Sequence, residues 1–98
     1  MRKTVERLGV IDSLYQEAGK QMRMFLDGEI LRDQFVGAIK VLFSLEIRYA
    51  DINKEKHELA GISFTLKEHV EKSEPLEKTL SYVRQTLDSK PEIFGGCY

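Results

Sequence analysis

Apolar residues in the middle of the chain recur at alternating spacings of four and three residues. This is the period of a helix face that packs lengthwise against other helices. The register begins at Leu31 and can be followed as far as Val70. Its members up to residue 52 are Leu31, Phe35, Ala38, Leu42, Leu45, Tyr49 and Ile52. The pattern predicts an all-α fold, an antiparallel helical bundle of three to four helices with coiled-coil-like packing.

Breaks in this pattern predict where the helices end. The helices are expected at about residues 3–27, 29–53, 54–72 and 75–88. Asp27-Gly28 is a turn dipeptide, and Pro75 suits the first turn of a helix because its missing N–H needs no partner there. The tail, residues 89–98, contains Pro91 and a Gly-Gly pair and is predicted to be non-helical. Residues 1–98 are expected to form a single domain.

The boundary between the second and third helices has two interpretations. Asp51 or Asn53 could cap a new helix, and Lys56 is a poor residue for a continuous apolar seam. The register nevertheless crosses this polar segment, and no proline or glycine interrupts it before Gly61. We favour a break, and a continuous helix over residues 29–72 is the alternative.

The segment 29–53 is apolar over roughly two thirds of its circumference. Beside the main repeat it carries a second stripe, formed by Val36, Ile39, Phe43, Ile47 and Ala50. One neighbouring helix cannot cover both stripes, so a further helix or a second copy of the chain must cover the rest. We therefore expect self-association, as a homodimer. The residues expected to pack in the core or at an interface are Phe35, Leu42, Phe43, Glu46, Tyr49, Ile52, Ile93 and Phe94.

Glu46 is the residue that breaks the apolar arc of this segment. Its carboxylate falls between the two stripes, beside Leu42, Phe43 and Tyr49. An unpaired charge buried there would be very costly, so we expect an arginine, histidine or tyrosine of another helix to pair with it. The alternative is a functional acid in a crevice of a small ligand-binding or enzymatic bundle.

The charge balance argues against a protein whose main role is to bind phosphates. The chain has 98 residues and a net charge of −1, whereas proteins that mainly neutralise phosphates carry a basic excess. Five of the six arginines do lie in the first half, at positions 2, 7, 23, 32 and 48. A nucleic-acid-associated regulator that uses the arginines of the first two helices is therefore kept as an alternative.

Cysteine content and hydropathy bear on the compartment. Cys97 is the single cysteine, so no intramolecular disulfide can form. The basic residues near the start interrupt any apolar signal core, and no stretch is long and apolar enough to span a bilayer. We expect a cytoplasmic protein that does not enter the membrane.

Motifs for catalysis or cofactor binding are missing from the sequence. His57 and His69 stand twelve residues apart, outside any zinc or di-iron spacing, and Gly95-Gly96 do not form a phosphate loop. We therefore predict no catalytic residue, metal or cofactor. The expected function is that of a non-enzymatic helical protein–protein interaction module: an adaptor, inhibitor or small regulatory or assembly subunit.

Overall fold

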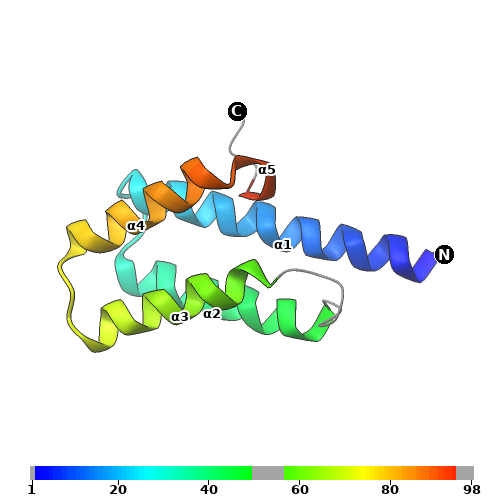
Figure 1. Ribbon diagram of the computed structural model, residues 1–98, viewed down its shortest axis with the longest axis horizontal. Helices are drawn as coiled ribbons and strands as arrows, with labels where there is room; N and C mark the ends of the chain where they lie inside the picture. Colours follow the sequence, from blue (N-terminus) through cyan, green and yellow to red (C-terminus); the bar gives the residue numbers. More distant parts are fainter. Residues whose placement is uncertain (1, 50–56, 95–98) are drawn as a thin grey trace.

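The computed structural model describes the backbone of residues 2–49 and 57–94 and the side chains of residues 11–49 and 57–94. Within these ranges the chain forms α1 (Arg2–Leu26), α2 (Arg32–Tyr49), α3 (Glu58–Glu71), α4 (Leu76–Ser89) and α5 (Pro91–Phe94), with no strand. The predicted all-α helical bundle is confirmed (Figure 1).

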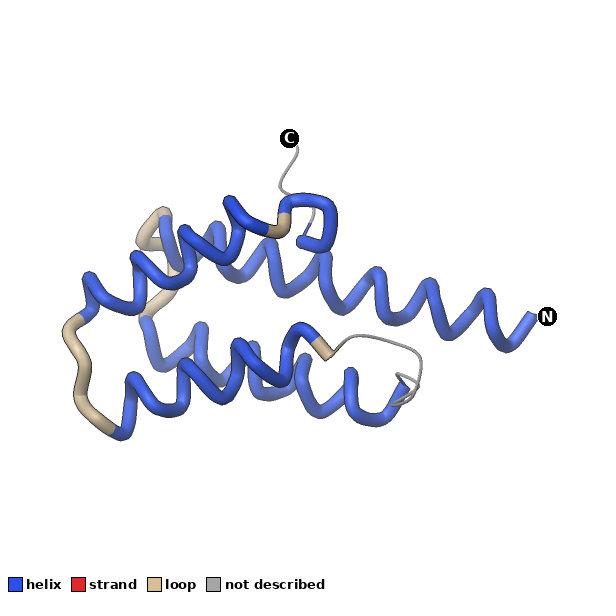
Figure 2. The backbone as a smooth tube through the Cα atoms, viewed as in Figure 1, coloured by secondary structure: helices blue, strands red, loops and turns tan. Residues whose placement is uncertain are grey.

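The four longer helices run up and down in alternation. α1 and α2 form an antiparallel hairpin, α3 packs on α2, and α4 and α5 pack on α1. Figure 2 shows α3 and α4 in one layer in front of the α1–α2 hairpin. α1 is thus the common support for α2, α4 and α5, whereas α3 depends mainly on α2.

The turn after α1 is built as the Asp27-Gly28 dipeptide predicted. Gly28 has a φ of +80°, a left-handed conformation that costs little for glycine. The N–H of Glu29 donates to the Met24 carbonyl at 2.9 Å, and that of Gly28 donates to the Phe25 carbonyl at 3.1 Å. These two bonds form a Schellman motif, which satisfies the last carbonyls of α1.

α2 begins three residues later than the apolar repeat predicted, at Arg32. Leu31 occupies the capping position: its carbonyl accepts the N–H of Phe35 at 2.9 Å. The side-chain oxygen of Gln34 accepts the Leu31 N–H at 2.8 Å, which is one half of a capping box. Leu31 therefore lies outside the helix whose apolar seam it was expected to open.

The alternative prediction of one continuous helix over residues 29–72 is wrong. The N–H of Leu59 donates to Glu46 Oε2 at 3.2 Å, although residues this far apart in one straight helix would be separated by about 20 Å. α3 therefore folds back on α2. The candidate capping residues between the two helices, and the packing candidate Ile52, lie outside the described residues.

The tail is also more ordered than predicted. Ser89 is the last residue of α4, and Pro91–Phe94 form one helical turn in which the Phe94 N–H donates to the Lys90 carbonyl at 3.2 Å. Proline suits the start of such a turn. Phe94 is fully buried against α1, with its ring edge-on to Tyr15 at 5.9 Å, so its burial offsets the cost of ordering this short segment.

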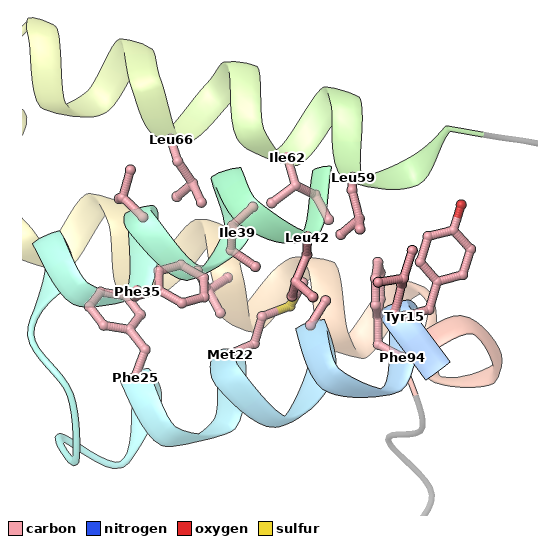
Figure 3. Packing of buried hydrophobic residues seen from close by; sticks show 14 of the residues in the cluster. Tyr15, Met22, Phe25, Phe35, Ile39, Leu42, Leu59, Ile62, Leu66 and Phe94 are labelled. Atoms are coloured by element: carbon pink, nitrogen blue, oxygen red, sulfur yellow. The ribbon is translucent and has the colours of Figure 1, made fainter. Parts of the chain in front are cut away.

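The apolar core fills the space between the two layers. At one end, the rings of Phe25 and Phe35 stack at 4.7 Å, and Tyr15 and Phe94 lie at the other end (Figure 3). Between them are the buried side chains of Ala18, Met22, Ile39, Leu59, Ile62 and Leu66. The apolar face of α2 is therefore covered largely within the chain, by α1 and α3. No helix of the described part is long and apolar enough to cross a membrane.

Candidate functional site

Glu46 joins three helices at the end of the bundle opposite the α1–α2 turn. The Tyr15 hydroxyl, from α1, donates to Glu46 Oε2 at 2.6 Å, and the backbone N–H of Leu59 donates to the same oxygen. The Glu46 side chain has no exposed surface. Tyrosine is one of the three partner types that the sequence predicted for this carboxylate.

The carboxylate of Glu46 takes the place of a helix cap. His57 is the residue before α3, but its side chain makes no capping bond. Glu46 instead binds the Leu59 N–H, which is one of the unpaired donors of the first turn of α3. A negative charge at this positive end of the helix also interacts favourably with the helix dipole.

His57 completes the cluster more loosely. Its Nδ1 lies 3.9 Å from Glu46 Oε1, and the His57 side chain is partly exposed. Glu46 Oε1 and His57 Nε2 are both buried, and neither has a hydrogen-bond partner among the described residues. The geometry therefore assigns the structural bonds to Oε2, while Oε1 faces the imidazole without a close contact.

The surroundings of Tyr15 keep its hydroxyl protonated. Burial raises the pKa of Tyr15 well above its usual value of 10.0, and the hydrogen bond to Glu46 and the charge of that carboxylate raise it further. Tyr15 is therefore a permanent donor near neutral pH. The arrangement is suited to holding α1, α2 and α3 together.

A cavity of about 400 Å³ lies between α3 and α4. Two of its lining side chains, Lys90 and Glu58, pair with each other. Elsewhere between the two helices, the His69 Nδ1 shares a hydrogen bond of 3.0 Å with the Thr79 hydroxyl. The lining residues of the cavity are His57, Glu58, Gly61, Ile62, Thr65, Tyr82, Gln85, Thr86, Ser89 and Lys90. Glu46 is not among them. Within the described residues, no group of three or more histidine, cysteine, aspartate or glutamate side chains could hold a metal ion.

The other predicted packing residues divide into buried and exposed. Phe35, Leu42 and Phe94 are buried inside the chain, Phe43 and Ile93 are partly buried against the core, and Tyr49 is 40% exposed. These side chains pack within one copy of the chain, apart from the exposed Tyr49.

Two of the arginines that suggested nucleic-acid binding make bonds within the chain. Arg23 donates to the Phe94 carbonyl at 3.3 Å, and Arg32 donates to the Glu74 carbonyl at 2.6 Å. The side chains of the two arginines nearest the start lie outside the described side chains.

An apolar hollow at the turn end of the bundle was not predicted from the sequence. It has a volume of about 200 Å³ and lies between the α1–α2 turn and the start of α4. Leu31 and Leu76 contribute to its lining although they are 72% and 48% exposed. The full lining is Phe25, Leu26, Gly28, Ile30, Leu31, Arg32, Leu76 and Leu80. We call this surface the turn hollow.

One signal in the sequence could have located the turn hollow. Leu31 follows closely on the Asp27-Gly28 turn, and a large apolar residue near a surface turn can be left exposed. Assigning Leu31 to the helical seam concealed this signal.

Comparisons with known proteins give no relative from which a function could be inferred. No family model, no curated protein and no solved structure matches the chain.

Proposed function

We propose that this chain is a non-enzymatic helical protein–protein interaction module, an adaptor, inhibitor or small regulatory subunit, that binds its partner at the turn hollow. The observation that carries the proposal is the exposure of Leu31 and Leu76 on a concave apolar surface. Exposed apolar patches with a polar border commonly mark interaction sites. A pocket that receives one large side chain of a partner is the usual form of an interface hot spot.

The placement of the polar residues supports binding rather than catalysis. Glu46 is fully buried, and its Oε2 is bonded to Tyr15 and Leu59. A catalytic acid must instead reach a substrate. The turn hollow has apolar residues at seven of its eight lining positions when Gly28 is counted with them, and Arg32 is the exception. Such a surface is suited to a partner's side chain.

The proposal is tested by selecting peptides from a random 12-residue phage-display library on the immobilised chain. We expect some selected peptides to carry a large apolar residue and to lose at least tenfold in affinity for the Leu31→Asp variant. Aspartate is a favoured capping residue, so this variant keeps or improves the start of α2. Fluorescence anisotropy with the labelled synthetic peptides measures the affinities.

Val41→Asp is the matched control. Val41 lies on α2, is 61% exposed, and is not part of the turn hollow. It should bind the same peptides as the unchanged protein. If no selected peptide distinguishes Leu31→Asp from Val41→Asp, the turn hollow is not the binding site and the proposal fails.

Self-association is the second candidate, and a different face of α2 favours it. Val41 and Tyr49 are exposed, and Leu45 between them is only partly buried. These residues are four apart and form one stripe along the helix. Light scattering over a concentration series measures the mass. A dimer that Val41→Asp dissociates and Leu31→Asp leaves intact would support it, whereas a monomer at all concentrations would exclude it.

A further inference from the structure

We infer that the partner segment that occupies the turn hollow is basic, with lysine or arginine side chains beside one large apolar side chain. The inference rests on the proposed function, because it names the chemistry of what the same surface binds. It follows from the charges that surround the hollow, which are predominantly negative.

Four exposed carboxylates stand next to lining residues of the turn hollow in the chain. Asp27 and Glu29 flank the lining residue Gly28, Asp33 follows Arg32, and Glu77 follows Leu76. None of the four is paired with a cation among the side chains of residues 11–49 and 57–94. Their charges are therefore available to a partner, and they lie around an apolar centre as in the polar rim of an interface.

Two cations lie nearby, and only one of them is paired with a carboxylate. Arg32 is the one basic residue of the lining, and its guanidinium donates to the Glu74 carbonyl and, at 3.4 Å, to the Thr79 hydroxyl. Lys78, on the same helix as Glu77, pairs with Glu74 at 3.1 Å. The rim of the hollow thus carries more free negative charge than positive charge.

Helix stability explains only part of this charge. Asp33 and Glu77 lie in the first turns of α2 and α4, where a carboxylate is favoured by the positive end of the helix. Asp27, however, directly follows α1 and lies at its negative end, where a carboxylate is unfavourable, and Glu29 lies in the turn between that end and the start of α2. Binding of a cationic partner gives Asp27 a role that the stability of α1 does not.

The same charges make a second copy of the chain a poor occupant. A symmetric dimer places the same patch of both copies face to face. Two turn hollows brought together would juxtapose carboxylates, and like charges across an interface cost binding energy. A basic segment of a different protein meets the apolar centre and the acidic rim together.

The experiment analyses those selected peptides whose binding depends on Leu31. We expect them to be enriched in lysine and arginine relative to the unselected library, and to bind more weakly as NaCl is raised. The double variant Asp27→Lys/Glu29→Lys should weaken their binding by roughly tenfold. The double variant Asp12→Lys/Asp88→Lys changes the net charge equally at exposed positions outside the hollow, and should change the affinity much less.

Failure of this inference can be told apart from failure of the proposed function. Peptides that need Leu31 but show no basic enrichment, or that bind both double variants equally, would overturn the basic partner and leave the turn hollow as a binding site. If no selected peptide depends on Leu31, the proposed function fails and the inference fails with it. Peptides enriched in aspartate or glutamate would overturn the inference directly.

Discussion

Removal of the Glu46 carboxylate is expected to destabilise the fold severely. Glu46→Ala leaves two buried donors without an acceptor, the Tyr15 hydroxyl and the Leu59 N–H. Each unsatisfied donor costs about 1–3 kcal/mol, and loss of the charge at the start of α3 adds about 0.3–1 kcal/mol. We expect a decrease of about 3–5 kcal/mol in the free energy of unfolding, a large fraction of the total for a domain of this size.

Glu46→Gln separates the hydrogen bonds from the charge. Its side-chain oxygen can still accept from Tyr15 and Leu59, but hydrogen bonds to a charged acceptor are roughly twice as strong as neutral ones. We therefore expect a smaller decrease, of about 1–2 kcal/mol. In a double-mutant cycle, Tyr15→Phe and Glu46→Ala should be strongly non-additive, since both remove the same bond.

Urea unfolding followed by circular dichroism at 222 nm measures these differences, provided that all variants share one slope. Amide hydrogen exchange at Leu59 gives a local check, since its N–H loses its acceptor only in Glu46→Ala. The reasoning is refuted if Glu46→Ala costs less than about 1 kcal/mol, or if Glu46→Gln is as stable as the unchanged protein or more so. The second result would favour a functional acid at this position.

Two further predictions concern α1. A Cβ at Gly19 would overlap the Phe94 carbonyl, so Gly19→Ala should lower the unfolding free energy by about 1–3 kcal/mol. A Cβ at Gly37 would meet nothing within 4 Å, so Gly37→Ala should raise the unfolding free energy by about 0.5–1 kcal/mol. Urea unfolding measures both, and equal effects would contradict the close packing of α5 on α1. Because the pKa of Tyr15 is raised in the folded state, that state keeps a proton which the unfolded chain releases above pH 10, and stability should fall as the pH rises beyond 10. Unfolding curves for Tyr15→Phe should lack this part of the decrease, and identical pH profiles would show that the hydroxyl is not held as described.

Much of the architecture could be predicted because its determinants are local. The spacing of apolar residues specifies helices, and Asp27-Gly28 specifies the turn that folds α2 back on α1. The sequence also predicts that the Glu46 carboxylate needs a partner, because Glu46 falls inside an apolar arc whatever the neighbouring helices are. The sequence could not name that partner, since Tyr15 comes from another helix.

The remaining features depend on how elements meet in space. The apolar repeat placed Leu31 inside the second helix. Periodicity alone does not show that the Leu31 N–H binds the Gln34 side chain and that this capping bond marks the start of α2. Phe94 lies in a segment whose proline and glycines predict a loop, and its burial depends on the close approach of Gly19, which lies far away in the sequence. The turn hollow likewise combines residues of the α1–α2 turn with Leu76 and Leu80.

The docking of the last helical turn on α1 has a consequence for synthesis on the ribosome. α1 and α2 are neighbours in the sequence, so their hairpin can form early, but Arg23 and Phe94 are 71 residues apart. Until that far residue has left the exit tunnel, the surface of α1 around Gly19 stays uncovered. A nascent chain therefore displays this surface of α1 to chaperones until the turn Pro91–Phe94 emerges, and the bundle cannot close before then.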